Sequence, residues 1–485
     1  MGNNKGNALY HNSAKRKNSR RIQKNWNVPK EQILYIPENL DIDKILSDKP
    51  PTFKYERDCF VYLLHLINDI PSRNKELISE FTQFYSPLVQ RRIYHYKKYL
   101  NYLEKHKVIL SQQGYSTLSG KSKGYAFCDK YETPVRPVNI TKKTLIKSII
   151  RFIDIDNMGI ESNLNIEPFI NRDLPYLTKW LNKHLTIDFV SAANYLLNEY
   201  EKDLKKKVKQ RIANRKFCSR MLVVHRIHKG DFQFTIDNNA GRLYTVLTQI
   251  KKELRQFIRY NGKKLVAVDI KNSQPYLSSV LFSEEHYNLN NCEKAIQYYN
   301  PLYKIEENYS NFKNILDKAR KKEDIPKFLS IISKGKIYEF YGAELQNNSI
   351  LDKNLNSTEI RKKAKKMLMN LLFGENDYKY FFDIASVLRK VFPTVYDTFY
   401  FIKYNKHNSL ACFLQNLEAN LVLDIACKII SEERPELEIF SIHDSIVTTE
   451  GNEEYVNGVL HEVLNRHIGL PPSLKNEKWD TSLIE

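Results

Sequence analysis

Two short apolar runs, far apart in the chain, each place an aspartate where a strand is expected to end. Residues 265–268 (Leu-Val-Ala-Val) are typical of a buried strand, and Asp269 follows directly. Residues 437–449 approximately alternate between apolar and polar side chains, with His443 and Asp444 at the crest of the predicted β-hairpin. The two acids can act together only if both strands belong to one sheet. We therefore expect Asp269 and Asp444 to meet across a shallow cleft.

Paired carboxylates at strand ends suit divalent cations, because Mg²⁺ prefers oxygen ligands and keeps several waters or phosphate oxygens. In two-metal sites the ions lie about 3.5–4 Å apart and stabilise both the attacking and the leaving oxygen. Asp269 alone could instead cap a turn or a helix. His443-Asp444-Ser445 is not expected to form a catalytic triad by itself, because neighbouring strand side chains point to opposite faces.

A third motif lies between the other two, in a basic segment at residues 356–374 that is expected to be a helix. Asn356 and Glu359 form a capping-box start, and Gly374 is a natural stop. One stripe of this helix carries a residue at every fourth position: Arg361, Lys365, Met369 and Phe373. Another face is apolar: Ala364, Leu368, Leu371 and Leu372. The two cations of the stripe suit a triphosphate, and its soft and flat side chains suit a base.

The composition favours a polyanionic partner. The chain has 485 residues, of which 42% are hydrophobic, enough for several domains with buried cores. Its 76 basic residues against 56 acidic ones give a net charge of +20, which attracts phosphate backbones. A general enrichment in Lys and Asn is the alternative explanation. The six cysteines contain no C-x-x-C pair, and no apolar run approaches the ~18–20 residues of a membrane span. We expect a cytoplasmic protein that is not in a membrane.

The N-terminal part of the chain is expected to be a basic tail followed by a mainly helical region. Residues 1–30 contain basic but no acidic side chains, which is typical of a disordered tail that holds nucleic acid loosely. A mitochondrial presequence is the alternative, and the low apolar content disfavours it. Apolar spacing predicts helices in the following region: residues 60–67, 77–102 and 142–152.

A strongly basic segment at residues 201–220 precedes the three motifs and is expected to be one helix. Lys207 and Arg211 lie on it and are expected to contact phosphates in a positional, sequence-independent way. A solvated helix face is the alternative explanation for the charges.

Together, the three motifs resemble motifs A, B and C of the family A DNA polymerases and the related phage-type single-subunit RNA polymerases. The resemblance covers roughly residues 242–450, and its most specific part is the spacing from Arg361 to Gly374. It implies an α+β fold in which a helical N-terminal region precedes a right-hand polymerase core with an antiparallel palm sheet, helical fingers and a helical thumb. The implied divisions are residues 1–30 as tail, 31–217 as N-terminal region with a thumb-like end, and 218–485 as core, with fingers at about 283–405.

The resemblance also implies residue roles. Asp269 and Asp444, with Ile270, would hold two Mg²⁺ ions, or Mn²⁺, and Lys365 would be a proton donor to pyrophosphate. The implied nucleotide-binding residues are Arg361, Lys365, Met369, Phe373, Gln274 and Tyr276. The implied contacts to the primer–template duplex are Arg242, Gln415 and His443. The partners would be this duplex and nucleoside triphosphates, and the protein would be a monomer.

The sequence departs from the family pattern after Asp269. Ser273-Gln274 lies four and five residues beyond Asp269, whereas the DNA polymerases have Ser-Gln two residues beyond. If Ser-Gln sets the register, Tyr276 takes the place of the Glu that excludes a ribose hydroxyl; if Asp sets it, Gln274 does. Phe373 favours deoxyribose, whereas Met369 and the sequence around His443 are similar to the RNA polymerases. The compact chain lacks room for promoter-reading regions, which favours DNA synthesis.

The predicted function is therefore template-directed nucleotidyl transfer, by a DNA-directed DNA polymerase without a proofreading exonuclease. The nearest sequence to an exonuclease motif, Asp154-Ile155-Asp156, is expected to be a surface loop. Three alternatives remain: a single-subunit RNA polymerase or primase, a two-metal nuclease, and a non-catalytic nucleic-acid-binding protein. The sequence leaves open the choice of nucleotide and template, the priming route and the role of the N-terminal region.

Overall fold

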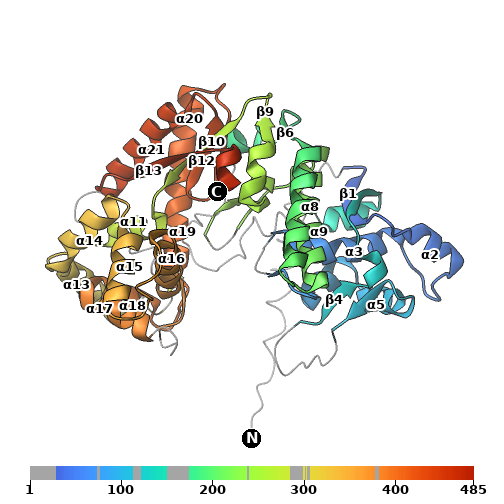
Figure 1. Cartoon of the computed structure of the whole chain (residues 1–485), viewed down its shortest axis with the longest axis horizontal. Coiled ribbons are helices and arrows are strands. Elements are labelled where there is room, and N and C mark those ends of the chain that lie inside the picture. Colours follow the sequence, from blue (N-terminus) through green and yellow to red (C-terminus); the bar gives the residue numbers. More distant parts are fainter. Residues whose placement is uncertain are drawn as a thin grey trace, which may run out of the picture.

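The computed structural model describes residues 29–73, 77–112, 122–149, 174–237, 240–283, 299–300, 302, 306–376 and 382–484. Figure 1 shows these parts as an arch, with a small sheet and the C-terminus near its top. A helical lobe forms one arm, and an N-terminal unit with helices α8 and α9 on its inner side forms the other. The predicted tail and Asp154-Ile155-Asp156 lie outside the described residues.

The N-terminal unit is built from short strands around one buried helix. Helix α3 (Arg57–Arg73) contains the predicted core segment 60–67, and every residue of that segment is buried. Its other helices are α2 (Ile42–Asp48), α4 (Ser86–Arg92) and α5 (Tyr96–Lys105), with residues 143–149 also helical. Its strands are β1 (Gln32–Pro37), β2 (Thr82–Gln83), β3 (Ile109–Ser111), β4 (Gly124–Phe127) and β5 (Val135–Ile140).

These strands correct the prediction of a mainly helical region. β1 pairs antiparallel with β5, and β2, β4 and β3 form a second antiparallel sheet in that order. The strands β2, β3 and β4 span only two to four residues, too few for a period of two to be distinguished from a turn. Thr82 and Gln83, which form β2, fall inside the stretch expected to be helical.

The basic segment is also not one helix. It is divided between α8 (Phe189–Lys205) and α9 (Gln210–Lys229), which pack side by side (Figure 1). Lys207 lies in the connection with a positive φ of 58°, which ends the helical path. Helix α9 is continuous through residues 217 and 218, so the expected division at that point falls inside a helix rather than in a linker.

The central sheet has four antiparallel strands in the order β11-β12-β10-β13. They are β10 (Leu265–Ile270), β11 (Ile439–Ile442), β12 (Ser445–Thr449) and β13 (Leu474–Lys478). Both strand predictions are confirmed, because the apolar run forms β10 and the hairpin forms β11 and β12. Helix α21 (Glu453–Ile468) follows the hairpin and packs against β10 and β12. The described residues therefore form an α+β fold with helices and small antiparallel sheets.

The helices between the first and second strands of this sheet in the sequence form the helical lobe. The lobe contains α13 (Glu306–Ala319), α14 (Asp324–Ser333), α15 (Ile337–Asn347), α16 (Ser357–Phe373), α17 (Phe382–Val391) and α18 (Pro393–Lys403). Shorter elements beside the sheet are α7 (Pro175–Thr178), β6 (Leu185–Ile187), β7 (Thr235–Ile236), β8 (Leu243–Tyr244), α10 (Val246–Gln249), β9 (Ile258–Tyr260) and α11 (Ser273–Leu277).

One long apolar helix runs from Ser409 to Glu433 as α19 (Ser409–Ala419), a π-helical segment (Asn420–Ala426) and α20 (Cys427–Glu433). Its 25 residues are long and apolar enough to cross a membrane, but 72% of its most apolar window is buried inside the protein. Burial of this kind is typical of a core helix, because the apolar residues already have protein partners.

Helices α15 and α16 approach closely at Gly342, and this contact is testable. A Cβ added at Gly342 would lie 2.5 Å from Ile360 Cγ2. We expect Gly342→Ala to lower the free energy of unfolding by about 1–3 kcal/mol, because the two helices must move apart. The matched control is Gly458→Ala in helix α21, where an added Cβ meets nothing within 4 Å. This variant should raise the free energy of unfolding by about 0.5–1 kcal/mol. Denaturant unfolding of both variants tests the contact; equal effects would contradict it.

Candidate active site

The sheet brings the two predicted acids together. Asp269, near the end of β10, pairs across the ladder with Ser445, the first residue of β12. The Ser445 hydroxyl donates to Asp269 Oδ1 at 2.8 Å, and Asp444 directly precedes Ser445. The backbone N–H of Ile270 donates to the carbonyl of Asp444 at 3.3 Å. The antiparallel register thus sets the two carboxylate-bearing residues beside each other.

The electrostatics of this pair are unfavourable without a cation. Burial, and next the neighbouring charge of Asp444, raise the pKa of Asp269 to about 7. Among the described residues, no Lys, Arg or His forms an ion pair with Asp269 or Asp444. Two adjacent carboxylates without a basic partner, in a protein of net charge +20, suit divalent cations with oxygen ligands. The residues present therefore fit a Mg²⁺ site.

Backbone strain surrounds both acids. His443, directly before Asp444, has a φ of 54°, and Asn272, three residues after Asp269, has a φ of 55°. A non-glycine residue in this left-handed region costs roughly 1–2 kcal/mol. Asn272 is buried, and among the described residues neither of its side-chain polar atoms has a hydrogen-bond partner. Such strain persists only where the surrounding structure enforces it, and it concentrates at functional sites.

The structure confirms the helix predicted at residues 356–374, which forms α16 with Asn356 and Gly374 as its caps. Asn356 and Glu359 form the reciprocal capping box, with hydrogen bonds of 2.9 and 3.2 Å. The buried face consists of the four predicted residues: Ala364, Leu368, Leu371 and Leu372. On the stripe, Arg361 is half-buried and Lys365 is exposed, whereas Met369 and Phe373 are partly buried against the core.

A buried tyrosine connects the cationic stripe to the acids. The Tyr338 ring on α15 lies 5.4 Å from the Arg361 guanidinium carbon and 5.8 Å from Lys365 Nζ. Burial, and next the charge of Asp444, raise the pKa of Tyr338. The charge of Lys365 in turn acts to lower the pKa of Asp269. Tyr338 lies close enough to Asp444, and Lys365 close enough to Asp269, for their charges to interact. The cationic stripe therefore faces the end of the sheet.

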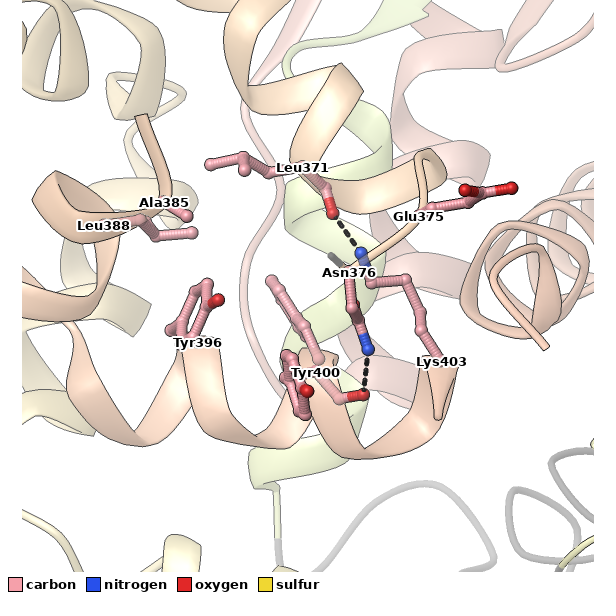
Figure 2. A pocket seen from close by; sticks show the side chains of 9 residues that line it. Leu371, Glu375, Asn376, Ala385, Leu388, Tyr396, Tyr400 and Lys403 are labelled. Carbon is pink, nitrogen blue, oxygen red and sulfur yellow. Dashed lines mark hydrogen bonds between the residues drawn. The ribbon is translucent and has the colours of Figure 1, made fainter. Parts of the chain in front are cut away.

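The C-terminal end of α16 is held by a buried lysine. Lys403 Nζ donates to the carbonyls of Leu371 at 2.6 Å and Gly374 at 3.1 Å, and Figure 2 shows the first of these bonds. Nearby, the Asn376 amide donates to the carbonyl of Tyr400 at 2.8 Å (Figure 2). Burial lowers the pKa of Lys403 to about 8. The charged form fits this place because cations stabilise the last carbonyls of a helix.

A second buried cluster lies beside the acids. Gln274 Nε2 donates to Glu418 Oε2 at 2.6 Å, and Arg242 Nη2 lies 2.7 Å from Glu418 Oε1. Burial raises the pKa of Glu418 to about 8, and Asp444 acts in the same direction. Glu418 therefore joins the segments that carry two predicted ligand contacts, Arg242 and Gln274. Gln415, on the same helix α19, is half-buried.

The position of Tyr276 corrects its predicted role. The side chain is fully buried, and its hydroxyl donates to the carbonyl of Leu470 at 2.7 Å. It belongs to the core and is not available to a nucleotide in this structure. The register set by Asp269 thus fits better, with Gln274 as the residue of this segment that lies beside the acid site. The side chain of Ile270 is also buried, which leaves only its backbone for a metal role.

The two predicted phosphate contacts on the basic segment differ in their surroundings. Lys207 is exposed in the connection between α8 and α9. Arg211 forms ion pairs with Asp129 and with Glu132, the second at 3.3 Å. Two carboxylates compensate its charge, so Arg211 fastens α9 to the N-terminal unit and is not free to bind a phosphate. This corrects the prediction for Arg211.

A groove of about 570 Å³ reaches His443, the residue before Asp444. It is lined by the end of α3, helix α9, residues 248–255 and the start of the β11–β12 turn. Its lining is net cationic, with one carboxylate, Glu253, beside five basic residues: Arg73, Arg220, Lys251, Lys252 and Arg255. Four of these cations also form ion pairs with carboxylates: Arg73, Lys251, Lys252 and Arg255. The His443 ring packs edge-on against Tyr244 at 5.5 Å, and burial lowers the pKa of His443 to about 4. His443 is thus a neutral side chain at the end of a positive groove.

Three residues of the site escaped the sequence analysis: Tyr338, Glu418 and Arg255. Tyr338 and Glu418 lie on helices whose spacing predicts only burial. Arg255 is half-buried, with its guanidinium over the Trp479 ring at 5.5 Å. The charges of Asp269 and Asp444 act to raise its pKa. No local pattern marks such residues, because only the tertiary fold brings them to the acids.

One further motif needs a structural test. Residues 120–124 read Gly-Lys-Ser-Lys-Gly, the spacing of the nucleophile elbow of serine hydrolases. That elbow joins the end of a strand to the start of a helix, whereas here the motif leads into strand β4, which begins at Gly124. This position before a strand does not fit a nucleophile elbow.

Comparisons with known proteins find likenesses among solved structures only. No family model and no curated protein matches the chain. Among solved structures, the chain is similar to one titled "POL domain of Pol1 from M. smegmatis complex with DNA primer-template and dNTP". The identity is 11% and the TM-score 0.43, over 70% of this chain and 74% of the other. A likeness of this size does not bear on function, so the site geometry must carry the assignment.

Proposed function

We propose that the protein is a template-directed nucleotidyltransferase, in the first place a DNA-directed DNA polymerase. One observation carries the proposal: two adjacent carboxylates, which no described Lys, Arg or His pairs with, face a Lys/Arg stripe across a buried tyrosine. The acids would hold metal ions, and the stripe suits the phosphates of a nucleotide. A nuclease needs the acids but not the stripe, and a binding protein needs neither.

In this proposal, Asp269 and Asp444 hold two Mg²⁺ ions, which when bound would polarise the reacting phosphate and lower the pKa of the attacking hydroxyl. Arg361 and Lys365 bind the triphosphate from the opposite side, and Arg361 would exchange its 2.9 Å ion pair with Glu339 for the phosphates. Lys365 also gives a proton to the leaving pyrophosphate. Because both cations lie on one helix and stack on Tyr338, their side chains are partly ordered before the nucleotide arrives, which favours positioning.

The remaining elements suit the duplex. The central sheet would be the palm, the helical lobe the fingers, and α8 with α9 the thumb. The cationic groove that ends at His443 would follow the phosphate backbone of the primer strand. Arg242 is paired with Glu418 in the free protein, so a duplex contact by Arg242 would compete with that pair.

A primer-extension assay tests the proposal. We expect Mg²⁺-dependent extension of a primer on a DNA template with deoxynucleotides, and slower extension with ribonucleotides. Preferred use of ribonucleotides without a primer would instead indicate an RNA polymerase or primase. Degradation of DNA without any extension would indicate a nuclease and would overturn the proposal.

Lys365→Ala gives a more specific test. We expect the rate of nucleotide incorporation to fall about 10²–10³-fold, as for the loss of one preorganised donor at a charged transition state. Lys366→Ala is the matched control, because Lys366 is equally exposed on the same helix but outside the stripe. Single-turnover incorporation measures both variants. Equal rates for the two would contradict the role of the stripe.

A further inference from the structure

A second hollow, of about 520 Å³, lies on the N-terminal unit. It is formed by the segment before α3, the connection between α4 and α5, and the helix at residues 143–149. Its size is within the range of about 300–1,000 Å³ that ligand sites occupy. Its lining shares no residue with the acid site or with the groove that leads there.

The charge of this hollow is one-sided. Six of its lining residues are basic: Lys54, Arg91, Arg92, His95, Lys98 and Lys142. None of the described residues that line it is a carboxylate. Lys142 is paired with Glu56 at 2.8 Å, and Arg92 donates to the Tyr62 hydroxyl. Lys54 and Lys98 are exposed, and neither forms an ion pair with a described residue. Two flexible ammonium groups are therefore available for an anion.

Aromatic rings accompany these cations. Tyr94 is 75% exposed, and its ring lies edge-on to the His95 ring at 4.5 Å. In the same lining, Phe53 and Tyr99 pack edge-to-face at 5.2 Å. An exposed ring beside unpaired lysines is the combination that binds unpaired nucleotides, because each base has a face to stack and each phosphate a charge to pair.

We propose that this hollow is a second nucleic-acid site that holds an unpaired strand, with a base on Tyr94 and phosphates on Lys54 and Lys98. A duplex fits less well, because its base faces are already stacked. The inference goes beyond the proposed function and does not depend on it, since strand binding here requires no catalysis.

The test measures binding of a fluorescent oligothymidylate of about 12 nucleotides to the full chain by anisotropy. Saturating unlabelled hairpin primer–template is present, so that the groove at the acid site is occupied. We expect Tyr94→Ala to weaken this binding roughly 5- to 150-fold, the effect of losing one stacked base. Lys54→Ala with Lys98→Ala should weaken it and reduce its salt dependence. Tyr94→Trp should retain binding.

The matched control is Tyr404→Ala with Lys428→Ala, an exposed tyrosine and an exposed lysine elsewhere on the protein, which should bind like wild type. Photocross-linking of a thiothymidine oligonucleotide should label the peptide that contains Tyr94. Wild-type affinity of Tyr94→Ala, labelling only at other peptides, or equal competition by duplex DNA would each overturn the inference. Primer extension by Tyr94→Ala, measured in parallel, separates failure of this site from failure of the proposed function.

Discussion

Replacement of Asp444 by Asn is expected to abolish primer extension, with a fall in the incorporation rate of at least about 10³-fold. Metal ions contribute several kcal/mol of charge stabilisation to a phosphoryl-transfer transition state, and about 1.4 kcal/mol corresponds to a tenfold rate change. An amide in place of the carboxylate keeps the shape of the turn but removes one charged ligand. Single-turnover incorporation with saturating Mg²⁺ measures the effect. Extension at the wild-type rate would refute the proposed site.

For the second acid, Asp269, a stability measurement distinguishes loss of a metal ligand from misfolding. In the metal-free protein, the pKa of Asp269 is raised to about 7, above that of the unfolded chain. The folded protein therefore binds the extra proton more tightly, and the contribution of Asp269 to stability falls as the pH rises from about 4 to 7. We expect Asp269→Asn to be more stable than wild type at pH 8 in EDTA, by about 1–3 kcal/mol, and equally stable at pH 4.

Duplex binding provides the second control for the acid variants. Removal of a carboxylate from the end of a cationic groove should leave affinity for a primer–template duplex unchanged or slightly increased, since one negative charge is lost. Anisotropy titration of the Asp444→Asn variant checks this. Loss of duplex binding together with lower stability at pH 8 would indicate a structural role for the acid instead.

The parts of the site that the sequence predicts are those with a strong local pattern. The run before Asp269 forms β10, and the alternation around His443 forms the hairpin, because each pattern reports the burial of one face. On α16, the capping box and the apolar face are found as expected, since both depend on spacing within a single helix. Strand pairing then places Asp269 beside Ser445.

The parts that the sequence does not predict depend on contacts between distant segments. In the sequence, Glu418 is simply a residue of an apolar helix. Its role follows only from its contacts with Arg242 and Gln274 in the folded protein. Tyr276 has the spacing of a nucleotide contact, yet the helix that starts after the left-handed Asn272 directs it to Leu470. The positive φ of Lys207 likewise divides a segment whose charge pattern reads as one helix.

The N-terminal unit is fastened to α9 by a buried ion cluster centred on Asp69. Arg226 Nη2, from α9, lies 2.6 Å from Asp69 Oδ1, and Arg73 Nε lies 3.0 Å from Asp69 Oδ2. Arg226 also donates to Gln249 Oε1 at 3.1 Å, at the end of α10. Burial acts to raise the pKa of Asp69, but Arg73 and Arg226 hold it well below its usual range. The cluster therefore joins three segments that surround the cationic groove.

Asp69→Ala is expected to lower the free energy of unfolding by about 3–5 kcal/mol, because it removes the close partner of Arg226 and leaves this buried cation with only the longer, 3.8 Å ion pair to Asp231. Asp43→Ala is the matched control: Asp43 also pairs with an arginine, Arg57, at 2.8 Å, but it is 62% exposed and should contribute about 0–1 kcal/mol. Denaturant unfolding compares the two variants.

The double replacement Asp69→Leu with Arg226→Met should recover much of the loss, because a buried ion pair can be replaced by apolar residues of similar volume more cheaply than it can be broken. Since the groove is built between the N-terminal unit and α9, Asp69→Ala should also weaken duplex binding, and the double variant should restore it in part. If Asp69→Ala and Asp43→Ala had equal effects on stability, the cluster would not be what holds the groove together.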